Sequence, residues 1–351
     1  MTSTDRITLG NAEKLGFISN LATMLTAGIP IFDVVQSLLD DAKGGQKRIL
    51  EEMRADLTQG KHMYLTLAKF PQVFDKVTVS IIKASEEAGT LDVTLHDLKQ
   101  TIQKDIEFND RVKSALLYPV FIIVIFFLVL LMILIVVVPK ITTVFGRLRV
   151  TLPLPTRILI FLSDLVMKNT IFVIIGIGLF IGLIVYLYKN QRARFNEFFV
   201  NLPLISTLVE EIDITKFSRS LYLLLSSGLP ITMALNLSKD VVIKRRTSQI
   251  ISHSRDMVFA GKSLSEGFRE AKGYIPSIMI KLMEVGEKTG SLDKSMQDIS
   301  EYFDYQVSTT LKTLTALLEP IMLVAVGVTI GGMMLAIISP IYGLIGQVGA
   351  R

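Results

Sequence analysis

Hydrophobic and polar residues alternate in long blocks along this chain. Residues 1–118 place apolar side chains three and four positions apart among charged ones, whereas residues 120–138 contain only Val, Phe, Ile, Leu and Met. The same succession returns later, with a mixed region over 189–313 and an apolar one over 314–345. Spacings of three and four predict amphipathic helices, and an apolar run of ~20 residues is long enough to cross a bilayer. The pattern predicts an all-α membrane protein.

The two mixed regions are copies of one another. FISNLATMLTAGIPI at Phe17–Ile31 returns as FSRSLYLLLSSGLPI at Phe217–Ile231, 200 residues later. An internal repeat of this length determines the architecture. Two further segments recur with an offset of 201, namely Glu86–Asp92 as Glu287–Asp293 and Arg111–Pro119 as Lys312–Pro320. We therefore predict two homologous helical-bundle domains, each leading into a membrane helix.

Three apolar runs predict three transmembrane helices. The short apolar segment 157–167 is interrupted by Asp164, so we interpret it as an interfacial or loop helix. The predicted parts are a first cytoplasmic helical domain (1–118), transmembrane helix 1 (119–139), a periplasmic loop (140–170), transmembrane helix 2 (171–188), a second cytoplasmic helical domain (189–313), transmembrane helix 3 (314–345) and a short periplasmic tail (346–351).

Charge around the apolar runs predicts the orientation. Lys and Arg residues flank the first run on its amino-terminal side and follow the second run, which favours a cytoplasmic position for both domains. Five basic residues in 139–170 argue the other way. The polar amino terminus does not resemble a cleavable signal peptide. We expect a multi-pass inner-membrane protein whose amino terminus is cytoplasmic.

Glycine and proline predict where helices end. Gly28 and Gly228 suit the left-handed end of a helix, and Pro30 and Pro230 cannot continue it. We likewise interpret Pro119 and Pro320, at the start of two apolar runs, as structural corners.

The repeated acidic motif has two interpretations. As a corner between helices, Gly89 or Gly290 ends one helix and Asp92 or Asp293 begins the next. The helix-corner interpretation does not explain the carboxylates of Glu86 and Glu287. Those two glutamates suit a basic group of a partner protein or a hard cation, although one carboxylate in each copy is weak support for a metal. The hypothesis is a partner-binding surface formed by Glu86, Gly89, Asp92, Glu287, Gly290 and Asp293.

Composition narrows the chemistry further. The chain has no cysteine and three separated histidines, and it contains no complete phosphate loop or hydrolase motif. We expect no enzyme activity, catalytic residue, metal or cofactor. The spans contain no ionisable residue, unlike most transporters. Lys244-Arg245-Arg246 is too short a basic run to indicate nucleic-acid binding.

These motifs together resemble the type II secretion F / type IV pilus assembly platform family. The likeness covers residues 15–345 and is most specific at Arg111–Pro139 and in the duplication. The short amino-terminal extension is similar to that of enteric type IVb members. The first copy departs from the family at Ser85, where the second copy keeps the usual glycine, Gly286.

The resemblance implies a function and partners. It implies a non-enzymatic inner-membrane platform that couples a cytoplasmic ATPase to the insertion or extraction of pilin. The implied partners are that ATPase, pilin, other inner-membrane assembly proteins and further copies of the chain. Two alternatives stay open: a transporter or channel subunit built by duplication, and a scaffold of a secretion or competence machine of the same family.

Overall fold

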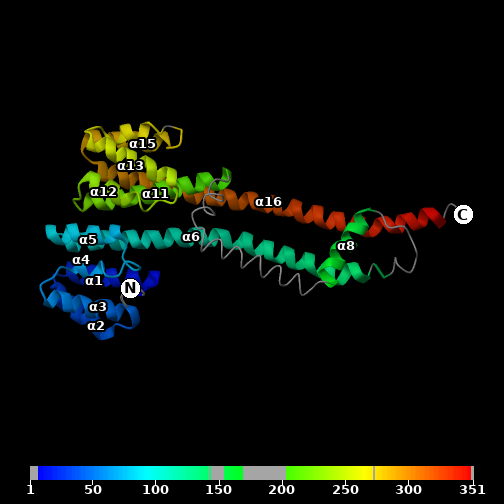
Figure 1. Ribbon diagram of the computed structural model, residues 1–351, viewed down its shortest axis with the longest axis horizontal. Helices are drawn as coiled ribbons and strands as arrows, with labels where there is room; N and C mark the ends of the chain where they lie inside the picture. The colour runs from blue at the N-terminus through cyan, green and yellow to red at the C-terminus, as the bar shows by residue number, and fades with distance from the viewer. Residues whose placement is uncertain (1–6, 141, 144–153, 169–202, 272, 349–351) are drawn as a thin grey trace. The chain divides into compact units, whose positions relative to one another are not determined.

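The computed structural model describes residues 7–140, 142–143, 154–168, 203–271 and 273–348. These residues form helices and no strand, so the predicted fold class is confirmed at that level (Figure 1). Two compact units divide the chain. Unit 1 combines residues 1–111 with 203–309, and unit 2 combines 112–202 with 310–351.

Unit 1 contains both copies of the repeat. The first copy is formed by α1 (Asn11–Thr26), α2 (Ile31–Asp41), α3 (Gly44–Thr58), α4 (Met63–Leu67), α5 (Lys76–Ala88) and the start of α6 (Leu91–Met132). The second copy follows the same order with α11 (Pro203–Ser226), α12 (Ile231–Ser238), α13 (Arg245–Phe259), α14 (Leu264–Arg269), α15 (Ser277–Thr289) and the start of α16 (Leu292–Val348).

Each copy has a hydrophobic core, and each core contains a pair of phenylalanine rings in contact. Phe17 contacts Phe74 in the first, with ring centroids 5.7 Å apart, and Phe217 contacts Phe268 in the second at 5.5 Å. All four rings are buried. Burial of a Phe side chain stabilises a fold by ~1.5–3 kcal/mol, so these pairs anchor the helices around them.

The predicted glycine–proline turns lie at equivalent places. Gly28 and Gly228 have φ of 79° and 81°, a left-handed conformation that glycine adopts without a Cβ penalty. Pro30 and Pro230 are the N-cap residues of α2 and α12.

The prediction of corners at Pro119 and Pro320 is wrong. Both prolines lie inside continuous helices, α6 and α16. A proline removes one backbone hydrogen bond but does not by itself end a long helix. The two helices therefore run from the bundles into the apolar sequence without a break.

A π-helical turn follows directly after α6, next to another proline, Pro139. Residues Ile133–Val137 form a π-helical turn, in which the N–H of Val138 bonds to the carbonyl of Ile133. In that register the carbonyl of Leu134 faces Pro139, which has no N–H to donate. Ser163 of α8 (Leu154–Lys168) supplies the missing hydrogen bond from its hydroxyl at 2.6 Å. The segment that we interpreted as an interfacial or loop helix thus packs on the end of the first apolar helix.

Two of the described helices are long and apolar enough to cross a membrane, over Leu91–Lys140 and Leu292–Ala336. In the most apolar 18-residue stretch of each, only 6% and 0% of the residues are buried inside the protein, unlike the core helices of a soluble domain. The predicted span 171–188 lies outside the described residues.

Candidate functional site: the acidic corners and the joint between the copies

The first acidic corner, residues 86–92, attaches α5 to α4. The carboxylate of Glu86 accepts hydrogen bonds from the N–H groups of Met63, at 2.8 Å, and Tyr64, at 3.1 Å. These donors belong to the first turn of α4, where no intrahelical partner exists. A negative charge is also favoured there by the helix dipole. Glu86 therefore caps a helix that begins 23 residues before it in the chain.

The second acidic corner, residues 287–293, repeats this arrangement. Glu287 accepts from the N–H of Leu264 and, at 3.1 Å, from that of Ser265, in the first turn of α14. In both copies the two carboxylate oxygens thus already accept hydrogen bonds. Each carboxylate thus spans the two donors of a helix N-terminus, and this geometry favours a structural role.

The remaining corner residues form the turn between two helices. Gly89 and Gly290 have φ of 72° and 71° and are solvent-exposed at the ends of α5 and α15. Asp92 and Asp293 are half-buried in the first turns of α6 and α16. The glycines and aspartates are therefore the accessible part of each corner, and they occupy the helix positions that the sequence predicts.

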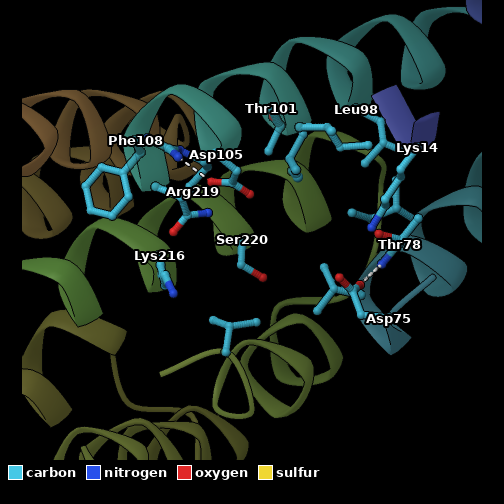
Figure 2. Close-up of a pocket in the computed structure, with 16 residues that line it drawn as sticks. Lys14, Asp75, Thr78, Leu98, Thr101, Asp105, Phe108, Lys216, Arg219 and Ser220 are labelled. Carbon is cyan, nitrogen blue, oxygen red and sulfur yellow. Dashed lines mark hydrogen bonds and ion pairs between the residues drawn. The ribbon is translucent and has the colours of Figure 1, made fainter. Parts of the chain in front are cut away.

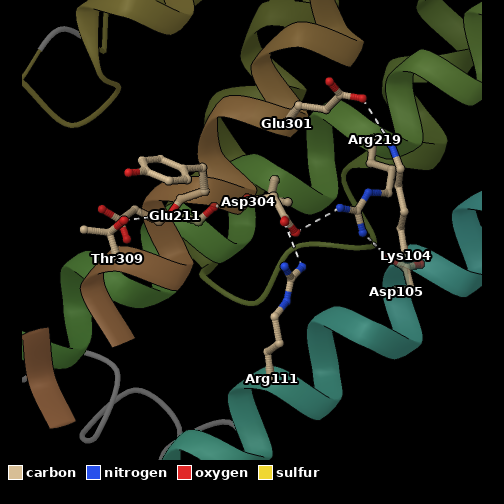
Figure 3. A network of polar contacts seen from close by, with 10 residues as sticks. Lys104, Asp105, Arg111, Glu211, Arg219, Glu301, Asp304 and Thr309 are labelled. Atoms are coloured by element: carbon tan, nitrogen blue, oxygen red, sulfur yellow. Dashed lines mark hydrogen bonds and ion pairs between the residues drawn. The ribbon is translucent and has the colours of Figure 1, made fainter. Parts of the chain in front are cut away.

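A buried arginine joins the two copies. Arg219 on α11 has a side chain only 9% exposed, and its guanidinium binds Asp105 on α6 of the first copy (Figure 3). The same guanidinium lies 3.3 Å from Asp304 on α16 of its own copy. A charge this buried requires such partners, because an unpaired one costs several kcal/mol.

Two further ion pairs extend this joint. Arg111 on α6 donates to Asp304 at 2.8 Å, and Lys104 donates to Glu301 at 3.1 Å. The hydrogen bond from Lys104 holds the pKa of Glu301 below its usual value. We call the six residues of these ion pairs the joint: Lys104, Asp105, Arg111, Arg219, Glu301 and Asp304.

A cavity of about 240 Å³ lies next to the joint, between α5, α6 and α11 (Figure 2). Its polar lining includes Lys14, Lys216 and Arg219 together with Asp75 and Asp105. Asp75 caps α5 through the N–H of Thr78 at 2.7 Å, and Asp105 binds Arg219. The acids thus already have protein partners, and the cavity is large and polar enough to hold water.

Comparison with known proteins confirms what the duplication implies. The sequence profile of type II secretion system (T2SS) protein F matches residues 17–139 and, a second time, residues 217–340. The chain belongs to the type II secretion system protein F family.

Individual members of the protein F family match almost end to end. A type II secretion system protein F of Pseudomonas aeruginosa is 30% identical, over 97% of this chain and 84% of the relative. A type IV pilus assembly protein PilC of Myxococcus xanthus is 28% identical, over 96% and 81%. The PilC of Pseudomonas aeruginosa is 26% identical, over 95% and 90%.

Within this protein F architecture the corners occur twice, whereas the joint occurs once. The repeat aligns Arg219, Asp105 and Asp304 with Ser19, Gln306 and Gln103. The joint was not predicted from the sequence, because it contains none of the motifs that the two copies share. The signal that identifies it is the opposite one, because every member of the joint except Arg111 is charged in one copy and neutral in the other.

Proposed function

We propose that this chain is a non-enzymatic inner-membrane platform of a type IV pilus or type II secretion machine. In this role it couples a cytoplasmic ATPase to the insertion or extraction of pilin subunits, and it works as an oligomer with other inner-membrane assembly proteins. The names of its relatives, type IV pilus assembly protein and type II secretion system protein F, support the proposal.

One structural observation carries the mechanical part of the proposal. The helices α6 and α16 each begin inside a bundle and continue into apolar sequence. Leu95 and Leu98 of α6 are buried in the first core, and Met296 and Ile299 of α16 in the second. An α-helix rises ~1.5 Å per residue, so the 42 residues of α6 measure about 63 Å. A displacement of a bundle would reach the apolar end through an unbroken helix.

The joint supports a coupled movement of both copies. Arg219 is bound to one carboxylate in each copy, so separating the copies would leave its buried charge with fewer partners. In this proposal, force applied to either bundle moves both.

The ATPase-binding surface is proposed at the acidic corners. Glu86 and Glu287 shape it by holding α4 and α14, whereas Asp92, Asp293 and the glycine turns present it. Carboxylates near a surface suit basic groups of a partner, which they attract over ~10 Å at moderate salt.

Pull-down of the secretion ATPase, followed by pilus or secretion assays, tests this surface. We expect the double change Asp92→Asn and Asp293→Asn to lower ATPase recovery by about tenfold and to reduce assembly. Asp298→Asn, an exposed aspartate on α16, is the matched control. Unchanged recovery in the double variant would remove the corners as the docking surface.

The topology proposed is three spans with both copies in the cytoplasm. Reporter fusions at Pro155 and Arg351 test it, and both should report the periplasm. A cytoplasmic reporter at Pro155 would overturn the three-span arrangement.

The alternative of a transporter or channel subunit makes a different prediction. Such a protein would move a solute or ion when reconstituted alone in vesicles, without an ATPase. The spans predicted from sequence contain no ionisable residue to carry charge or protons, which favours the platform.

A further inference from the structure

The two copies contact each other through different faces. From the first copy, α5 packs on α11 and α12 of the second, and Ile81 of α5 is fully buried in the second core. Val77 and Ala84 of the same helix pack beside it. Figure 1 shows α11 and α12 next to α5, with α15 on the side of the second copy that is turned away from α5.

The second copy carries the equivalent of the α5 face on α15, where the two outer positions are uncovered and Leu282 packs partly against the second core. The repeat aligns Val77, Ile81 and Ala84 with Ile278, Leu282 and Val285. Ile278 is 40% exposed and Val285 57%.

On α6 and α16, too, positions that lie at the contact in the first copy are exposed in the second. Thr101 and Lys104 on α6 line the contact with the second copy, and they align with Tyr302 and Tyr305 on α16. Both tyrosines are exposed, at 42% and 68%. Tyrosine is among the residues most enriched in protein interfaces.

This asymmetry makes the contact between the copies head-to-tail. In a two-fold contact, each copy would use the same face and no equivalent face would remain free. In a head-to-tail contact, one copy of each face is left over and is available to another molecule. We call the face of α5 and α6 the donor face, and its free equivalent is on α15 and α16. The acceptor face is formed by α11, α12 and α16, and its equivalent is on α1, α2 and α6 of the first copy, where Gln100 also borders the contact within the molecule.

We propose that Ile278, Leu282, Val285, Tyr302 and Tyr305 bind the α1–α6 face of a second molecule of this chain, in the orientation that joins the two copies within one molecule. This inference rests on the proposed function only in that the platform is an oligomer, and it names the surface that makes it one.

The charges on the two free faces fit this occupant. Within one molecule the joint pairs Lys104 with Glu301 and Asp105 with Arg219. At the proposed contact the repeat places neutral residues at all four of these positions, pairing Tyr305 with Gln100 and Gln306 with Ser19. These four positions are neutral on both faces, so docking would bury no unpaired charge at them, which is the costly outcome. The α15 face keeps one charge, at exposed Lys281, which aligns with Ser80.

The third ion pair of the joint, Arg111 with Asp304, has an equivalent at the proposed contact that keeps one charge, and a carboxylate lies near that charge. Arg111 and Asp304 align with Lys312 and Gln103. The amide of Gln103 is hydrogen-bonded to Glu107 at 3.0 Å, so a carboxylate stands beside the position that Lys312 would meet.

The proposed contact should be weaker than the one within the molecule. Leu223 of the internal acceptor face is buried, and it aligns with exposed Thr23 on the free acceptor face. Less apolar area is therefore removed from water when a second molecule binds. We expect reversible assembly of intact chains.

Site-directed cross-linking in membranes tests the proposal, because the chain has no native cysteine. Two differently tagged full-length chains, one with Tyr305→Cys and one with Gln100→Cys, are co-expressed without the ATPase and treated with a short bismaleimide. We expect a cross-linked dimer that contains both tags. The double variant Lys104→Cys, Glu301→Cys in one chain is the benchmark for the internal contact and should react without forming a dimer.

A second comparison tests the apolar part of the surface. Ile278→Glu with Val285→Glu should lower the dimer yield by at least about tenfold, because the contact would bury two carboxylates without partners. Val93→Glu is the matched control, since Val93 is 59% exposed and aligns with Lys294. The thermal unfolding midpoint of each variant checks that the bundle is intact.

Three results would overturn the proposal. Tyr305→Cys chains that react mainly with each other would indicate a two-fold contact. A yield no higher than that of Tyr305→Cys with Ala55→Cys, an exposed position on α3, would indicate no contact at this face. An unaffected dimer in the Ile278→Glu, Val285→Glu variant would place self-association elsewhere. Because the ATPase is absent, each of these results leaves the proposed coupling function to its own test.

Discussion

Asp304 of the second copy accepts a hydrogen bond at 2.8 Å from Arg111 of the first, 193 residues earlier in the chain. The same carboxylate also approaches the buried guanidinium of Arg219. One aspartate thus serves two arginines from two homologous copies. The joint is the place where the duplicated chain differs most clearly from a pair of independent domains.

Removal of Asp304 should therefore weaken the joint. Asp304→Ala removes one of the two carboxylates that Arg219 contacts and the carboxylate that Arg111 binds, and we expect the free energy of unfolding to fall by about 2 kcal/mol. Denaturant unfolding of the purified protein measures this. Lys104→Ala is the control, because both members of the Lys104–Glu301 pair are about half exposed and exposed pairs contribute ~0–1 kcal/mol. Equal effects of the two variants would contradict the special role of Asp304.

The capping role of Glu86 gives a local prediction. Glu86→Ala leaves the N–H groups of Met63 and Tyr64 without their acceptor and should cost about 1–2 kcal/mol. Amide hydrogen exchange of α4 should increase more than that of α14, which keeps Glu287. Glu87→Ala removes an exposed carboxylate whose distance to Lys83 is 3.9 Å and should have little effect. Exchange that rises equally in both copies would argue against a direct cap.

Acid sensitivity should differ between the copies. The side chain of Asp56 is only 4% exposed, and it accepts from Lys69 at 2.6 Å, Thr66 at 2.8 Å and Lys61 at 3.2 Å. Burial alone would raise the pKa of Asp56, but these hydrogen bonds outweigh it and lower the pKa below its usual value. The second copy has buried Met257 at the equivalent position.

The sign of the pH effect follows from that lowered pKa. The stability from the ionised Asp56 is complete above about pH 4, its unfolded pKa, and is lost as pH falls through the lower folded pKa. Hydrogen exchange measured from about pH 5 downwards should show α3 and α4 opening before α13 and α14. In Asp56→Asn that difference should disappear. A first copy that remains as protected as the second at low pH would contradict this assignment.

The contact between Ser163 and the carbonyl of Leu134 is also testable. Ser163→Ala leaves a buried carbonyl that Pro139 cannot satisfy, at a cost of about 1–3 kcal/mol. We expect greater protease accessibility of α8 in detergent or membranes. The double variant Ser163→Ala, Pro139→Ala should recover part of the loss, because an alanine in place of the proline restores the backbone N–H. A double variant no more protected than the single one would disprove the explanation.

Local residue chemistry predicted much of this fold. Gly28, Gly228, Gly89 and Gly290 lie at helix ends as expected, since the left-handed conformation favours one residue type whatever surrounds it. The prediction at Pro119 was wrong because the effect of this residue depends on its surroundings. The effect of a proline on a helix depends on whether neighbouring turns compensate for one lost hydrogen bond, which sequence spacing does not reveal.

The candidate site was predictable only in part. The corner motif was found because it recurs, but the carboxylate of Glu86 acts on Met63, and no local pattern connects residues 23 positions apart. The close packing at Gly286 was likewise not predictable from a local sequence pattern. A Cβ built at this residue would lie 2.4 Å from the hydroxyl of Ser295, so the glycine allows close approach of α15 and α16. The first copy has Ser85 there and needs no such approach, a difference that requires the packed structure.

The unbroken course of α6 has a geometric consequence. A rigid rod about 63 Å long that tilts by about 5° at one end moves its other end sideways by about 5 Å. Small rotations of a bundle would thus become displacements as large as a helix radius at the far end. A break at Pro119 would shorten that lever arm, so in the proposed coupling function the continuity of α6 at this proline would be what amplifies the movement.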